Sequence, residues 1–337
     1  MKRRRSDRPR RCRAALVAAA LVVCATPAAV AAQATGEGAI FLLLPVGARA
    51  VATGGAVAAA GVGSENVWWN PATIARDTRG EVAIHHAQTV AATSDALVAV
   101  IPWQRFGVFA VAANLVDLFE QEVTPPDGGP AIGTFLPRNV VASLSFARAL
   151  GGRLDVGATA KVLQVRLDCS GQCGTVPVDA STTTAADVGV RFSLDGWAPV
   201  AVGFALRNAG GGLRLGKGAD REPLPTRYQA GVLYVVPGLD RYANGLEVRL
   251  SSDVSSPTRQ ADPGLRLGAE ASWQHRVALR GGYVFEDGSD GGAGASGPTV
   301  GLGLVAGRLV VDIAREFQGL SVDAGQPPTY VTLRYRF

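Results

Sequence analysis

Three histidines, His85, His86 and His275, are the side chains best suited to acid–base chemistry or metal binding near neutral pH. A hydrolase would need partners for them, such as the serine and asparagine of a barrel lipase. No nucleophile or carboxylate motif accompanies them, and adjacent residues of a strand point to opposite faces, which would separate His85 from His86. We therefore predict that the chain is not an enzyme and has no metal or cofactor site.

Cys169 and Cys173 could carry redox or metal chemistry. They are the only cysteines after residue 32, and three residues separate them. A metal pair is the competing interpretation, but two cysteines without a nearby histidine fall short of a four-ligand site. In an exported chain the two thiols meet an oxidising compartment, so we predict a small loop closed by a disulfide.

A glycine-rich segment at 210–218 has part of the pattern of a phosphate-binding loop. Gly218 follows Lys217 at the position where that loop needs a serine or threonine, and no helical pattern comes after it. We expect a flexible loop without a nucleotide.

The positive charge of the chain is concentrated at its start. The formal net charge is +5, but residues 1–32 hold eight Lys/Arg against the single acid Asp7, which leaves 25 basic and 27 acidic residues in the remainder. The arginines precede an apolar run from Ala14 to Cys24 and small residues before Gln33, as in a signal peptide. We predict a signal peptide at 1–32. A nucleic-acid-binding arm and a lipoprotein signal at Cys24 fit this pattern less well, and we expect no nucleic-acid partner.

The composition after residue 32 favours β structure. No window holds the eighteen or so apolar residues of a membrane helix. Glycine occurs 42 times and methionine once, which disfavours a helical enzyme.

From Glu81 onward, segments of about ten residues alternate in polarity between clusters of Gly, Pro, Asp and Ser, as at 182–194. This alternation is typical of a transmembrane β-barrel, although a soluble sandwich would share it. The predicted strands are 81–91, 94–103, 105–119, 137–150, 152–168, 180–194, 198–208, 224–236, 244–255, 263–274, 275–286, 297–306, 307–318 and 328–337. An even number, fourteen, lets antiparallel strands close without exposed edges.

The last strand decides between a barrel and a sandwich. Val331, Leu333, Tyr335 and Phe337 alternate with polar residues, and Phe337 is aromatic. The segment resembles the terminal-strand signal of outer-membrane barrels, with Tyr335 and Phe337 as its aromatic positions, which implies recognition by the barrel-assembly machinery. Together with the signal peptide it predicts a multi-pass β-barrel in the bacterial outer membrane, in contact with outer-membrane lipid.

Charged residues of both signs are predicted on the inward face of the strands. A lumen of one sign would indicate ion selection, whereas mixed signs favour paired networks that hold a plug. These residues are Asp155, Lys161, Asp187, Arg191, Glu247, Arg249, Asp253, Arg266, Glu270, Arg280, Glu286 and Asp312.

The segment from Val46 to Ala75 follows neither helix nor strand periodicity. Its many glycines and alanines suit a chain confined against a wall, with Gly47, Gly54 and Gly55 free to turn. Arg49 is its only basic residue before Asn70, so if buried it needs a carboxylate or several carbonyls around it. Asn70-Pro71 ends the segment, because the residue before proline avoids the helical region. A plain connector is the alternative to a plug.

Residues 41–75, read as FLLLPVGARAVATGGAVAAAGVGSENVWWNPATIA, resemble the N-terminal signature of the PorV/PorQ family of outer-membrane proteins, relatives of the FadL-type transporters. Thr53 stands where methionine is usual, 63–65 replaces an aspartate-rich turn, and Thr73 stands where glycine is usual. The resemblance implies a plug folded inside a barrel of fourteen strands. We therefore predict a plug at 33–78, with Gly47, Arg49, Gly54, Gly55, Asn70 and Pro71 as its motif, and a barrel at 79–337.

Two functions follow from this resemblance. The first is a client-binding or shuttle component beside the type IX secretion machinery, with secretion components and secreted proteins as partners. The second is a FadL-type passage for hydrophobic molecules, entered past the apolar residues 39–44 and the Trp68-Trp69 pair. A hydrolase has only the histidines in its favour.

Overall fold

The structure is a computed structural model that describes residues 37–61, 63–90, 92–103, 105–125, 128–172, 180–194, 199–214, 220–256, 263–286, 296–318 and 326–337. The predicted signal peptide lies outside these ranges, so it stays a prediction.

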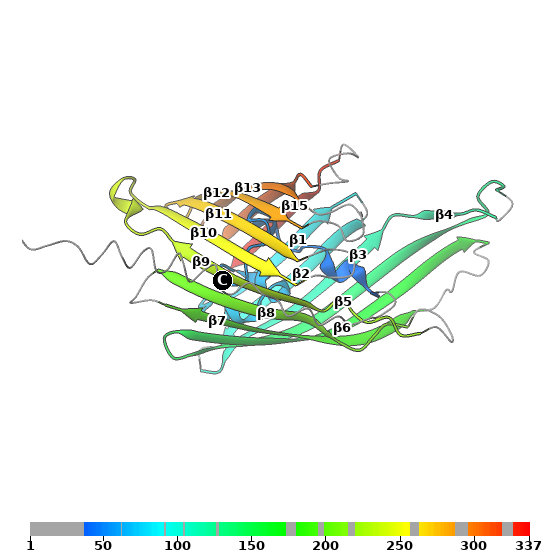
Figure 1. Ribbon diagram of the computed structural model, residues 1–337, viewed down its shortest axis with the longest axis horizontal. Coiled ribbons are helices and arrows are strands. Elements are labelled where there is room, and N and C mark those ends of the chain that lie inside the picture. Colours follow the sequence, from blue (N-terminus) through cyan, green and yellow to red (C-terminus); the bar gives the residue numbers. More distant parts are fainter. Residues whose placement is uncertain are drawn as a thin grey trace, which may run out of the picture. The chain divides into compact units, whose positions relative to one another are not determined.

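Fourteen antiparallel strands of the described chain form a closed barrel, as predicted (Figure 1). Each strand pairs with its sequence neighbour, β3 pairs with β5, and β1 pairs with β15 to close the ring. The strands are β1 (Glu81–Gln88), β2 (Ala92–Trp103), β3 (Gly107–Leu118), β5 (Gly133–Leu150), β6 (Leu154–Gly171), β7 (Ser181–Ser193), β8 (Val200–Gly210), β9 (Arg227–Val235), β10 (Leu246–Ser255), β11 (Gly264–Trp273), β12 (Val277–Phe285), β13 (Gly297–Ala306), β14 (Leu309–Glu316) and β15 (Thr329–Arg336). Each overlaps one predicted segment.

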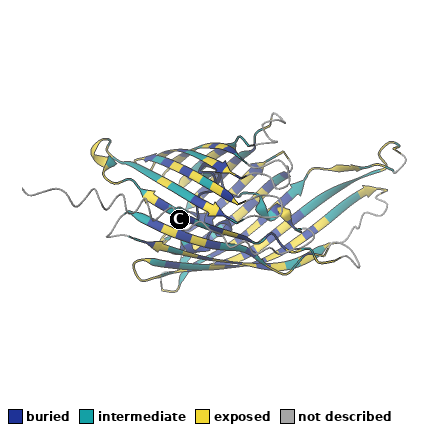
Figure 2. Cartoon of the chain, viewed as in Figure 1, coloured by how far each residue is buried: buried dark blue, intermediate teal, exposed yellow. Residues whose placement is uncertain are grey.

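Buried and exposed residues alternate along the strands (Figure 2). The types of residue on the two faces are those of a membrane barrel. Outward positions carry large apolar side chains such as Ile84, Leu97 and Leu144, all more than half exposed. Inward positions carry buried polar ones such as Asp155 and Asp312. A soluble barrel would reverse this arrangement, so the outer face is matched to lipid.

Three details differ from the sequence prediction. A short extra strand, β4 (Gln121–Val123), pairs with β5, in a segment that lies between two predicted strands. His275 was predicted in a strand but lies in the β11–β12 turn, between Trp273 and Val277. Cys169 was predicted in a loop but lies near the end of β6, which extends to Gly171. It is disulfide-bonded, and because Cys173 falls outside the described residues, the pairing with it stays a prediction.

The connections alternate in length around the barrel. At one end, the turn end, residues 151–153, 274–276 and 307–308 join neighbouring strands, and the β9–β10 connection contains the short helix η4 (Leu239–Arg241). Longer segments join most of the strands at the other end, the loop end, where the connection 89–91 between β1 and β2 is the short exception. Among the described residues, no helix is long and apolar enough to cross a membrane.

The predicted plug lies inside the barrel as short helical pieces: η1 (Ile40–Leu43), α2 (Ala48–Ala52), η2 (Ser64–Trp68) and η3 (Pro71–Ile74). Helix α2 packs against β12 to β15, η2 against β1 to β3, and η3 against β5 to β7. Alanine side chains allow this close packing, and Ala50, Ala52 and Ala72 are fully buried. Gly47 and Gly54 adopt left-handed φ values of 97° and 64°, which alanine would strain. The plug therefore touches most of the barrel wall.

Candidate functional site: the plug and the lumen around it

Asn70 joins the plug to itself and to the wall. Its Oδ1 accepts a hydrogen bond of 3.0 Å from Ala72 N and so caps η3, while Pro71 occupies the first helical position. Its Nδ2 donates to Ala58 O at 2.6 Å and lies 3.3 Å from Val190 O on β7. The side chain is completely buried, so this asparagine fixes where the plug turns.

Glycines in the wall make room for the plug backbone. A Cβ placed on Gly189 of β7 would lie 1.9 Å from Asn70 Oδ1, and one on Gly203 of β8 would lie 2.0 Å from Ala58 O. On the opposite side, a Cβ on Gly282 of β12 would lie 2.3 Å from Gly54 N. No side chain fits at such distances, so these wall positions are shaped to the docked plug.

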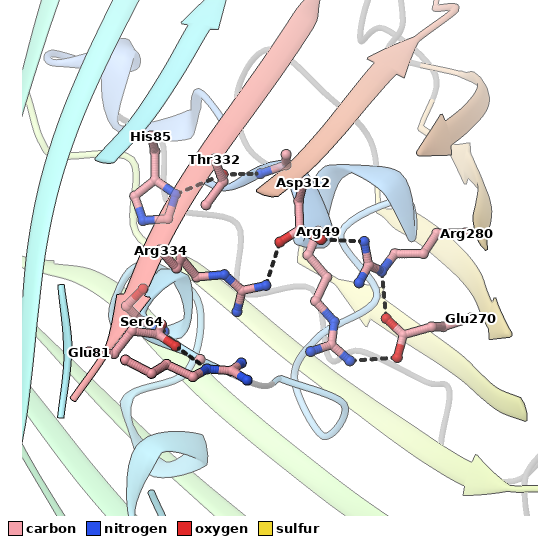
Figure 3. Close-up of polar contacts among 12 residues, drawn as sticks. Arg49, Ser64, Glu81, His85, Glu270, Arg280, Asp312, Thr332 and Arg334 are labelled. Atoms are coloured by element: carbon pink, nitrogen blue, oxygen red, sulfur yellow. Dashed lines mark hydrogen bonds and ion pairs between the residues drawn. The ribbon is translucent and has the colours of Figure 1, made fainter. Parts of the chain in front are cut away.

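A chain of ion pairs connects α2 to the wall (Figure 3). Arg49 Nη2 lies 2.6 Å from Glu270 Oε1, and Arg280 Nε lies 2.5 Å from Glu270 Oε2. Arg280 Nη1 continues to Asp312 Oδ1 at 2.7 Å, and the other oxygen of Asp312 pairs with Arg334. The Arg49 side chain thus meets a carboxylate on the inward face, the partner that its burial requires.

Backbone groups of the plug are bound by wall side chains as well. Ala48 N donates to Thr332 Oγ1 at 2.9 Å, and His85 Nδ1 lies 2.9 Å from the same oxygen. Ser64 N donates to Glu81 Oε1 at 2.8 Å (Figure 3). These bonds occupy amides that short helical turns leave without internal partners.

The other side of the plug is held in the same way. Asp253 Oδ2 accepts from Ala58 N at 2.7 Å and from Gln229 Nε2, also at 2.7 Å. Arg191 Nε donates to Ala59 O at 2.9 Å, and Arg249 Nη2 donates to Ala60 O at 3.1 Å. Mixed charges in the lumen therefore serve the plug, in line with the sequence interpretation.

Glu65 is the most deeply buried acid of the plug, with 1% of its surface exposed. It packs against Gly47, where an added Cβ would lie 2.1 Å from Oε2. Burial raises the pKa of its carboxyl to about 7, against the opposing effect of the Arg334 guanidinium. Burial raises the pKa of Asp77, in the segment before β1, to about 7 as well, and the neighbouring Glu81 adds to this. The docked plug therefore favours protonated carboxyls at these positions.

The histidines occupy three different environments. His85 is buried and belongs to the plug contacts, whereas His86 faces outward, with its Nδ1 2.7 Å from Asp95 Oδ1. His275 is exposed in its turn. The structure thus separates all three, and among the described residues no group of three or more His, Cys, Asp or Glu could hold a metal ion.

A small, mostly apolar pocket lies between the start of the plug and the wall, toward the loop end. Its apolar lining is Phe41, Leu42, Leu44, Val46, Trp68, Trp69 and Val141. Trp69 Nε1 donates to Val46 O at 2.8 Å, and the Arg207 guanidinium lies 4.9 Å from the centre of the Trp69 ring. Lys161 and Asn114 add polar groups at one side. The sequence predicted the two tryptophans and 39–44 as an entry point, but not Arg207.

Some functional residues were not predicted from the sequence. Arg334 and Gln229 are fully buried and hold the plug or its partners, yet neither was among the predicted inward charges. Arg334 alternates with Leu333 and Tyr335 in the last strand, so its period-two position carried the signal.

These features define a class of protein: a transmembrane β-barrel of fourteen strands, closed by an N-terminal plug. No protein-family model and no curated protein matches the chain.

Solved structures share the fold. The toluene transporter TbuX of Ralstonia pickettii has a TM-score of 0.55 and 13% identity, covering 88% of this chain and 100% of that one. The toluene transporter TodX of Pseudomonas putida has a TM-score of 0.56 and 12% identity, covering 85% and 95%. The monoaromatic hydrocarbon channel CymD has a TM-score of 0.57 and 14% identity, covering 88% and 98%. At such identities the likeness establishes the fold, and these neighbours are transporters and channels.

Proposed function

We propose that the chain is an outer-membrane passage for small hydrophobic molecules, with the plug as its gate. The observation that carries the proposal is the apolar pocket at Trp68 and Trp69, which lies between the plug and the barrel wall and has a few polar groups at one side. Apolar pockets with a few placed polar groups are the usual form of small-molecule sites. The fold shared with toluene transporters and a monoaromatic hydrocarbon channel favours the same function.

The pocket is closed in this structure. Its volume is about 20 Å³, whereas a cavity that binds benzene measures on the order of 150 Å³. A substrate must therefore displace part of its lining. We propose that residues 40–46 move, because they contribute four apolar side chains to the pocket and none of them is held by an ion pair in the described structure.

The second candidate is a PorV/PorQ-like client-binding or shuttle component of type IX secretion, with its cargo surface on the external loops. The observation in its favour is the number of bonds between plug and wall, which suits a barrel that stays shut. The fold comparisons favour the transport function over this one.

The test compares Leu44→Arg, which places a charge in the pocket, with Ile40→Arg at the start of the adjacent η1, where the side chain is 45% exposed. Cells that carry the wild-type protein should take up labelled toluene faster than cells without it. Leu44→Arg should remove this difference, and Ile40→Arg should preserve it. Uptake that is independent of the wild-type protein would overturn the proposal. If Asn70→Ala with Pro71→Ala reduced surface display of secreted proteins and left uptake unchanged, the second candidate would replace the first.

A further inference from the structure

A cavity of about 280 Å³ lies at the turn end, between Arg49 of the plug and strands β10 to β15. Its lining is dominated by guanidinium groups, and only three carboxylates face them: Glu247, Glu270 and Asp312. Six arginines line it, and one of them, Arg336, pairs with Glu81 outside the lining at 3.0 Å, which leaves an excess of two positive charges. The six arginines are Arg49, Arg249, Arg276, Arg280, Arg334 and Arg336.

The two buried carboxylates of this cavity are already saturated. Each oxygen of Glu270 and of Asp312 has an arginine partner. The guanidinium of Arg249 comes no closer to Glu270 than 3.9 Å, and the exposed Arg276 makes no ion pair among the described residues. Since a guanidinium has five N–H donors, donor capacity remains after all internal ion pairs are made.

The rim of the cavity is formed by an unusual turn. Gln274 and His275 both have left-handed φ values, 49° and 52°, and Arg276 N donates to Trp273 O at 2.9 Å. The short turns at the same end use glycine at left-handed positions, Gly151 and Gly307. Non-glycine residues held in this conformation are strained, and such strain gathers at functional sites. Here the turn presents Arg276 and His275 to the cavity.

We propose that this cavity binds a small oxyanion with two or more negative charges, carried by carboxylate or phosphate groups. Guanidinium groups bind such oxygens in pairs of parallel hydrogen bonds, and two excess charges favour an anion with at least two negative charges. Because Arg49 belongs to the plug and the other arginines to the wall, the bound anion bridges the two. It adds to the contacts that keep the plug docked, and it does so whatever molecule the barrel transports.

The test uses the purified full-length protein in detergent, with citrate and pyrophosphate as carboxylate and phosphate probes at constant ionic strength. Calorimetric titration should show saturable binding of at least one probe. Arg276→Glu reverses a charge at the rim, and Arg241→Glu makes the same change on the neighbouring η4, outside the lining. Loss of one charge-assisted hydrogen bond corresponds to roughly tenfold in affinity. We therefore expect Arg276→Glu to weaken binding at least about tenfold and Arg241→Glu to change it less than about twofold.

Each other result counts against the site. Absence of saturable binding by the wild-type protein, equal weakening in both variants, or unchanged binding in Arg276→Glu would overturn it. Heat-modifiable mobility in gels confirms that each variant has a folded barrel, and Arg276→Gln serves as the milder variant if Arg276→Glu fails that check. A failed titration leaves the toluene uptake result untouched, so the two proposals stand or fall separately.

Discussion

Replacing Glu270 by glutamine removes the charge at the centre of the plug contacts and barely changes the shape of the side chain. Arg49 and Arg280 both pair with Glu270, at 2.6 Å and 2.5 Å. Arg280 keeps Asp312, but Arg49 has no other ion pair in the described structure. The plug, and not the barrel wall, therefore loses its partner.

The size of the effect follows from burial. The side chains of Glu270 and Arg49 are 8% and 15% exposed. Removal of one partner from a buried pair costs about 3–5 kcal/mol. The glutamine oxygen still accepts one hydrogen bond and Arg49 is partly solvated, so we expect plug docking to weaken by about 2–3 kcal/mol. This corresponds to a population of undocked plug roughly 30- to 150-fold larger.

Amide hydrogen exchange measures this change directly, because it reports the opening free energy of each protected amide. The amides of Ala48, which bonds Thr332, and of Val51, which bonds Gly47 O, report on α2. Glu247→Gln is the matched control, since it removes a carboxylate from the same cavity without touching Arg49. Unchanged exchange in Glu270→Gln, or an equal change in the control, would refute the assignment of Glu270 as the main charge partner of the plug.

Two further predictions concern the same docked state. Burial raises the pKa of Glu65 to about 7 from an ordinary 4.5. The contribution of its protonated carboxyl to docking stability is therefore fully present below about pH 4.5, and this contribution is lost as the pH rises through 7. Glu65→Gln should flatten the pH dependence of amide exchange in α2 between pH 5 and 8, so that only the pH dependence due to Asp77 remains. An unaltered pH profile would contradict this role of Glu65. Gly189→Ala should clash with Asn70 and weaken plug docking by about 1–3 kcal/mol in the same assay. The control Gly281→Ala should leave docking unchanged, because its Cβ meets nothing closer than 3.9 Å. Equal effects of the two substitutions would argue against the close fit between plug and wall.

The barrel could be predicted from the sequence because each strand carries its own signal. A period of two in polarity is local, so it located all fourteen strands and placed residues such as Asp155 and Asp312 on the inner face. Irregular positions carried no such signal. The three residues of β4 are too few to show a period, and Gln274 and His275 are left-handed residues at which a turn would normally have glycine.

The sequence was sufficient to recognise the plug but not to predict its contacts with the barrel wall. Its glycines and alanines indicated a confined chain, yet the residue that Arg49 would meet depends on contacts 221 positions apart in the sequence. The raised pKa of Glu65 likewise depends on burial, which no local pattern reveals. The wall glycines were equally hidden, because Gly189 and Gly282 read as ordinary small residues in strands until the plug lies against them.

The distribution of the plug contacts indicates how the proposed gate would open. Most bonds from polar and charged wall side chains fall on residues 48–64, at Ala48, Arg49, Ala58 and Ser64 among others. If residues 48–64 left the lumen, buried arginines and carboxylates would lose their partners, and water would have to replace each of them. The segment before it is held mainly by apolar contacts around Phe41 and Trp69. Opening of the apolar pocket is therefore far less costly at residues 40–46 than at α2, so a substrate is expected to move the front of the plug while its charged part remains docked.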